Sequence, residues 1–162
     1  MERTTLLSLS FMLALVTQVS AQQQPCIEFH GNIHSGFGDP GMSHIVLAIG
    51  DQPAETVPVS PSGAFRVYVP EGAQAVMSFV LSDHVRKSVV VDGQDAFVSN
   101  SNKKKNKRIA FDVMLNEIRP DEEAVEQIVG RIRFLRGSGL MKVEHLDEEG
   151  TGEYLPGLAA SF

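Results

Sequence analysis

Residues 64–81, AFRVYVPEGAQAVMSFVL, form two runs in which every second side chain is apolar, separated by the turn Pro70-Glu71-Gly72. The alternating apolar positions are Phe65, Val67 and Val69 in the first run and Ala75, Met77, Phe79 and Leu81 in the second. Successive side chains of a β-strand point to opposite faces of a sheet. Each run therefore predicts a strand with one buried face and one face toward water.

The same alternation continues on both sides of this stretch. The predicted strands cover residues 27–34, 45–49, 56–59, 65–69, 75–81, 85–91 and 109–115. Turns rich in Gly and Pro, such as 35–41 and 60–63, separate them. Pro58 cannot donate to a ladder, so the third run is expected at a sheet edge. We predict an all-β fold, an antiparallel two-sheet sandwich of about seven strands over residues 22–116.

A C-terminal β-hairpin extension is predicted over residues 129–146, with Arg-Gly-Ser-Gly as its turn. Its register places Ile132 and Phe134 on the same apolar face as Met141 and Val143. An apolar face of this size must cover either the sandwich or another chain.

Two further segments of this region have a different composition. Residues 117–128 are a predicted linker, in which Asp121-Glu122-Glu123 is expected to begin a short helix. Residues 147–162 form an acidic tail containing Gly, and we expect this tail to be disordered.

The first residues are typical of a secretory signal peptide, predicted over residues 1–21. Arg3 supplies the positive charge, Leu6–Val16 is the apolar segment, and Val19-Ser20-Ala21 fits a cleavage site. Spanning a bilayer takes about 20 apolar residues, so a retained membrane anchor is the minor alternative. We expect an exported protein that is periplasmic, associated with an outer membrane, or secreted.

Length and charge limit the class of protein. The chain has 162 residues, which is the size of one domain with a small appendage. Its formal net charge of -6 argues against nucleic acid as a partner, because phosphate binding requires clustered Lys and Arg. The single cysteine, Cys26, excludes an internal disulfide. It is expected to be a buried or capping thiol, with intermolecular pairing and lipidation as alternatives.

Five short stretches carry a resemblance to a known family. They are Phe29-His30-Gly31-Asn32-Ile33, Gly38-Asp39-Pro40-Gly41, Ile45-Val46-Leu47, Pro61-Ser62-Gly63-Ala64-Phe65-Arg66-Val67 and Phe111-Asp112-Val113-Met114-Leu115. The region from Cys26 to Asn116 resembles a carboxypeptidase regulatory-like domain, a transthyretin-like β-sandwich of the prealbumin type found in exported bacterial proteins. The resemblance implies a fold and an extracytoplasmic setting, and it implies no activity.

The histidines are the first candidates for metal ligands. His30, His34 and His44 lie near Glu28 and Asp39 in the sequence, and neutral imidazoles bind zinc or copper. Residues four apart in a strand are about 13 Å apart, which is too far to share one ion. We therefore predict solvent-facing histidines, no metal and no cofactor.

Two short motifs resemble parts of enzymes. His145-Leu146-Asp147-Glu148 has the His-x-x-Glu spelling of zinc carboxypeptidases, and Arg136-Gly137-Ser138 is similar to the C-terminus of transthyretin-related hydroxyisourate hydrolases. No histidine follows the His-x-x-Glu motif to serve as a third zinc ligand, and the Arg-Gly-Ser motif lies inside the predicted hairpin. We predict no catalytic residues and no enzymatic activity.

A basic run interrupts the alternation. The candidate contact residues for an anionic or acidic partner are Lys103, Lys104, Lys105, Lys107 and Arg108. The lysines are predicted to lie in a long exposed loop, residues 94–107, that Arg108 directly follows. This basic run is expected to contact an anionic glycan, a lipid headgroup or an acidic protein. The alternative is a solvated loop without a partner.

These observations lead to a prediction of function. We expect an exported, non-catalytic β-sandwich module for binding or structural support at the cell envelope, with an envelope protein or a glycan as its partner. One alternative is an accessory subunit of an envelope or surface assembly, which uses an exposed edge such as the Pro58 strand. A second is a small transthyretin-like hydrolase.

Overall fold

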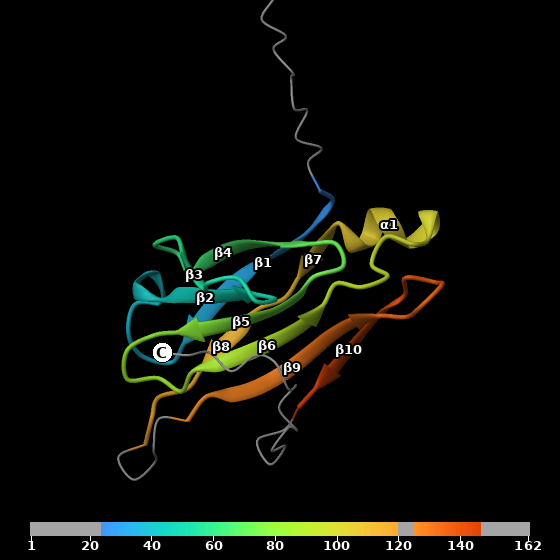
Figure 1. Ribbon diagram of the computed structural model, residues 1–162. Helices are drawn as coiled ribbons and strands as arrows, with labels where there is room; N and C mark the ends of the chain where they lie inside the picture. Colours follow the sequence, from blue (N-terminus) through green and yellow to red (C-terminus); the bar gives the residue numbers. More distant parts are fainter. Residues whose placement is uncertain (1–23, 120–124, 147–162) are drawn as a thin grey trace, which may run out of the picture.

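The structure is a computed structural model, and it describes residues 24–119 and 125–146. These residues form a β-sandwich of two sheets (Figure 1), which confirms the predicted fold class. The strands are β1 (Cys26–Ser35), β2 (His44–Ile49), β3 (Glu55–Pro58), β4 (Ala64–Pro70), β5 (Gln74–Val80), β6 (Lys87–Asp92), β7 (Arg108–Ala110), β8 (Val113–Leu115), β9 (Gln127–Phe134) and β10 (Met141–His145). The helical elements are the 3-10 helix η1 (Pro40–Met42) and the α-helix α1 (Asn100–Asn106).

The two sheets differ in width. The smaller has the order β4-β1-β7, with β8 also paired to β1, and the larger has the order β10-β9-β6-β5-β2-β3. β3 is an edge strand, as Pro58 predicted. The sheets are mixed and not purely antiparallel as predicted, because β1 pairs in parallel with β7 and β8, and β6 pairs in parallel with β9. Alternation reports which face of a strand is buried and does not report the direction of its neighbours.

The core lies between the sheets and is built from the alternating rows. Phe29 and Phe79 are completely buried, and with Phe65 and Phe111 they form edge-on ring contacts with centroids 5.3 to 6.2 Å apart. Aromatic pairs in this geometry stabilise a core beyond the area that they bury.

The predicted hairpin is present in the predicted register. Phe134 pairs with Met141, and Ile132 pairs with Val143. Ile132 and Phe134 belong to the buried core, so the hairpin widens the larger sheet and closes part of the sandwich.

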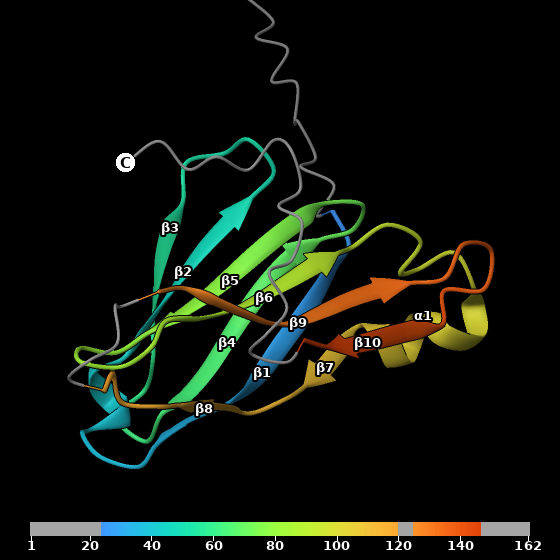
Figure 2. The same ribbon diagram turned by 90° about the horizontal axis from the view of Figure 1, so that it is seen from below.

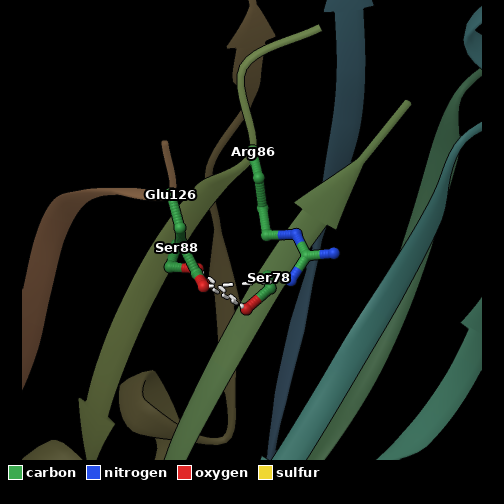
Figure 3. A network of polar contacts seen from close by, with 4 residues as sticks. All are labelled: Ser78, Arg86, Ser88 and Glu126. Atoms are coloured by element: carbon green, nitrogen blue, oxygen red, sulfur yellow. Dashed lines mark hydrogen bonds and ion pairs between the residues drawn. The ribbon is translucent and has the colours of Figure 1, made fainter. Parts of the chain in front are cut away.

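A polar cluster on the larger sheet fixes the start of β9 (Figure 3). The carboxylate of Glu126 accepts hydrogen bonds from the hydroxyls of Ser78, at 2.8 Å, and Ser88, and it lies 3.9 Å from the guanidinium of Arg86. The backbone N–H of Gln127 donates to the carbonyl of Arg86 at 2.8 Å. These bonds hold β9 beside β6 in the parallel direction.

The predicted loop over residues 94–107 is wrong in its second half, which is α1. Asn and Ser favour loops in isolated chains, but Asn106 is buried and its Nδ2 donates to the carbonyls of Ala96 and Gly139 at 2.6 and 2.7 Å. Tertiary hydrogen bonds therefore stabilise a helix that the local sequence does not favour.

Some predictions fall on other parts of the chain. The leader 1–21, the helix start within 120–124, Glu148 and the tail 147–162 lie outside the described residues. The described linker residues 117–119 and 125–126 are not helical. Within the described ranges no helix is long and apolar enough to cross a membrane. Cys26 is exposed rather than buried, and its Sγ donates to the carbonyl of Gln24 at 3.3 Å.

Candidate functional site

A groove opens between the two sheets where β7 and β8 face the β9–β10 hairpin. Figure 2 shows these four strands along one side of the sandwich. The larger sheet has two strands, β9 and β10, beyond β6, whereas β7 and β8 are the last strands of the smaller sheet. The inner face of the hairpin is therefore only partly covered, and the uncovered part forms one wall of the groove.

The groove holds a cavity of about 270 Å³ with a mainly apolar lining. The apolar lining residues include Val89, Ile109, Met114, Val129, Met141 and Val143. Met141 is 39% exposed and Val143 is 44% exposed, while Met114 at the opposite wall is 54% exposed. Clustered apolar side chains that remain open to water are typical of a binding surface.

A bulge in β9 contributes to this lining. Ser88 pairs with Ile128 and the next residue, Val89, pairs with Gly130, so Val129 has no partner in β6. A bulged residue is left out of the ladder and is turned relative to its neighbours. Val129 lines the groove as a result.

Both walls of the groove end in unpaired backbone. β7 and β8 pair with β1 on one side, and β10 pairs with β9 on one side; no strand within the described residues pairs with their other sides. An unpaired strand edge presents N–H and C=O groups that another strand can bond.

Asp112 is a polar residue in the lining of the groove. Its Oδ1 accepts from the backbone N–H of Asn32 at 2.8 Å, and its Oδ2 lies 3.4 Å from Nε2 of His34. The bond from the Asn32 N–H is the main reason that the pKa of Asp112 lies below its ordinary value, and the neighbouring His34 contributes. The groove thus has an anionic group in its lining, together with the cationic residues Lys87 and Arg131.

The close approach of Phe111 to Gly31 explains why the predicted strand 109–115 is divided into β7 and β8. A Cβ on Gly31 would lie 1.7 Å from the carbonyl oxygen of Phe111. Between β7 and β8 the N–H of Phe111 donates to the carbonyl of His30 at 3.1 Å, and at the next residue the carboxylate of Asp112 accepts the Asn32 N–H in place of a backbone carbonyl.

The candidate metal ligands are not brought together. His30 and His34 lie in β1, His44 lies in β2 of the other sheet, and His34 contacts Asp112. Among the residues that the structure describes, no group of three His, Cys, Asp or Glu side chains is placed to hold a metal ion.

The structure places the predicted basic residues on an ordered element and not in a loop. Lys103, Lys104 and Lys105 are exposed on α1, and Lys107 caps its C-terminus. Arg108 begins β7, and its Nη2 lies 3.1 Å from Oε1 of Glu28.

Sequence reasoning identified Met141 and Val143 as apolar residues that must cover something, but it missed the groove. Its other wall depends on β7 and β8 lying beside β1, and this pairing leaves no signal in the alternation. The bulge at Val129 lies next to Gly130, and sequence reasoning did not use this glycine as a sign of a bulge.

Comparisons with known proteins find distant similarity among solved structures. No family model and no curated protein sequence matches the chain. Among solved structures, the chain is similar to catechol 1,2-dioxygenase from Acinetobacter sp. ADP1 inhibited by bound mercury. The two share 11% identity with a TM-score of 0.40, and the match covers 67% of this chain and 60% of that chain.

This finding contradicts the prediction that the chain is not an enzyme, because the similar structure is that of an enzyme. We withdraw that prediction, and a similarity of this size assigns no activity in its place. The prediction rested on the lack of contiguous catalytic motifs, and residues that meet only in the folded chain leave no such motif.

Proposed function

We propose that the mature chain is an exported β-sandwich binding module of the cell envelope, which holds an extended apolar segment of a partner protein in the groove. The open apolar groove between two unpaired strand edges carries this proposal. Export rests on the predicted leader, and the extracytoplasmic setting agrees with the resemblance to a carboxypeptidase regulatory-like domain.

The groove suits a polypeptide strand in two ways. An added strand can bond the free edge of β7–β8 or of β10, and its alternate side chains can pack on Met114, Met141 and Val143. A glycan would require hydrogen-bonding groups along the groove, whereas the lining is mainly apolar. These features favour an envelope protein as the partner.

The same groove supports the alternative role as an accessory subunit of an envelope assembly. In that role the bound segment would belong to a permanent neighbour in the assembly. The groove lies at the β10 side of the larger sheet, opposite the edge strand β3 that contains Pro58.

The test uses a phage-displayed library of short peptides with apolar residues at alternate positions, panned against the whole chain. We expect binders whose affinity falls at least tenfold in Met141→Lys/Val143→Lys, because two charges would enter an apolar site. Affinity is measured by titration calorimetry, and circular dichroism checks that the variant folds.

Tyr68→Lys is the matched control, because Tyr68 is 51% exposed on β4, away from the groove. This variant should keep the wild-type affinity. The proposal fails if no binder is recovered, or if the Tyr68 and groove variants lose affinity equally.

A further inference from the structure

One end of the molecule is formed by α1, the segment that precedes it and the turn of the β9–β10 hairpin, and hydrogen bonds tie these three together. Figures 1 and 2 both show α1 beside the turn of the β9–β10 hairpin. Asn106 Nδ2 donates to the carbonyls of Ala96 and Gly139, and Asn102 Nδ2 donates to the carbonyl of Ser138 at 2.9 Å. We call residues 94–107 and 135–140 together the tip.

The tip is basic in a protein that is acidic as a whole. Its basic residues are Lys103, Lys104, Lys105, Lys107 and Arg136, all of them exposed. Its acidic residue is Asp95, so five positive charges and one negative charge give a net +4, against -6 for the chain. Charge concentrated in this way attracts an anionic surface.

The tip also exposes large apolar side chains beside these lysines. Val98 is 47% exposed, Leu135 is 40% exposed and Leu140 is 54% exposed. They come from the segment before α1 and from both sides of the hairpin turn. A soluble anionic polymer would use the charges alone and would leave these side chains in water.

We propose that the tip docks on the surface of an anionic lipid bilayer. The lysines lie at the level of the lipid phosphates, and Val98, Leu135 and Leu140 enter the headgroup region. Basic residues near an anionic membrane each contribute about 1 kcal/mol of attraction. Apolar side chains beside them add the burial that holds a protein at the interface.

The N-terminal strand β1 starts close to the tip. The backbone N–H of Glu28 in β1 donates to the carbonyl of Lys107 at 2.9 Å, so the chain enters the sandwich next to the tip. Docking through the tip leaves the groove, which runs along the side of the sandwich, open to a partner.

The experiment is cosedimentation with vesicles of three parts phosphatidylcholine to one part phosphatidylglycerol, compared with pure phosphatidylcholine. The whole chain, expressed with its leader, is purified from the periplasm of a bacterial host. We expect binding that depends on phosphatidylglycerol and weakens with salt. Lys103→Ser/Lys105→Ser should lower the partition coefficient about 25-fold, which is about fivefold for each lysine.

Arg66→Ser/Lys142→Ser is the matched control, because both side chains are exposed, the net charge changes equally, and the tip and the groove lining stay intact; it should alter binding less than about twofold. Leu135→Ser/Leu140→Ser should lower binding about tenfold and keep the salt dependence. The proposal is overturned if binding does not require phosphatidylglycerol, or if the control pair loses as much as the tip pair. It is also overturned if the chain binds polyphosphate in solution but not the vesicles.

Discussion

Gly31 shows how the absence of one side chain shapes the site. A Cβ at this position would lie only 1.7 Å from the carbonyl oxygen of Phe111. Because the obstructing atom belongs to the backbone, it cannot turn aside as a flexible side chain can. The division between β7 and β8, and with it one wall of the groove, depends on this contact.

We expect Gly31→Ala to lower the free energy of unfolding by about 3 kcal/mol, because the backbone of Phe111 must move. Urea denaturation followed by circular dichroism measures the loss. Gly36→Ala is the matched control, since nothing lies within 4 Å of its Cβ position; it should change stability by about 1 kcal/mol or less. Equal effects of the two changes would show that the contact at Phe111 does not constrain the fold.

Asp112 links the same site to pH. Its folded pKa is held below the ordinary value of 3.8, chiefly by the bond from the Asn32 N–H. As the pH falls, the unfolded chain takes up this proton first. The contribution of Asp112 to stability is therefore present above that ordinary value and is lost as the pH falls through the folded pKa.

The stability difference between the wild type and Asp112→Asn should decrease as the pH falls from about 5 to about 2. The variant keeps an acceptor for the Asn32 N–H but has no charge. The pKa of Glu144 is also lowered, mainly by Lys142, but its effect is common to both proteins and cancels. Urea denaturation at a series of pH values measures the difference, and a constant difference would contradict the assignment.

At the scale of elements, one face of the hairpin contributes both to the core and to the groove. Phe134 is 7% exposed and lies in the core, whereas its partner Met141 is 39% exposed and lines the groove. β9 therefore completes the sandwich, and β10 extends past it.

We expect Phe134→Ala to destabilise the protein by about 3 to 5 kcal/mol, because it opens a cavity in the core. Met141→Ala should cost about 1 kcal/mol or less, since its side chain already contacts water. Guanidinium denaturation of both variants tests this division. If Phe134→Ala were as mild as Met141→Ala, the hairpin would be an appendage and not part of the core.

The helix α1 shows the limit of local signals at this scale. Its sequence, NSNKKKN, has the composition of a loop, and sequence reasoning predicted a loop. Buried hydrogen bonds from Asn106 to Ala96 and Gly139 make it a helix instead. These partners are 10 and 33 residues away, so no stretch as short as a helix contains both of them.

At the scale of the whole molecule, the surfaces proposed here arise from the arrangement of the sheets. The groove exists because the larger sheet is wider than the smaller one. The tip exists because α1 and the hairpin turn meet at one end. The groove and the tip are separate surfaces, so the proposed partner and the proposed membrane can be bound together.

The sequence by itself determined most of the strands, the buried rows, the edge position of β3 and the register of the hairpin, but not the division of 109–115 into β7 and β8. Each of these follows from alternation, Pro or turn residues within a short stretch, such as Phe65 to Val69 or Ile132 to Val143. Physical constraints on the backbone act at that range, so the pattern of side chains records them.

Only the tertiary structure decided which strands are neighbours, and in which direction. The parallel pairs of β1 with β7 and β8, and of β6 with β9, join residues separated by about 40 to 80 positions. The alternating pattern of buried side chains in a strand is the same whichever strand is its neighbour in the sheet. The groove and the tip depend on these long-range choices, and for that reason the sequence showed their residues without showing the sites.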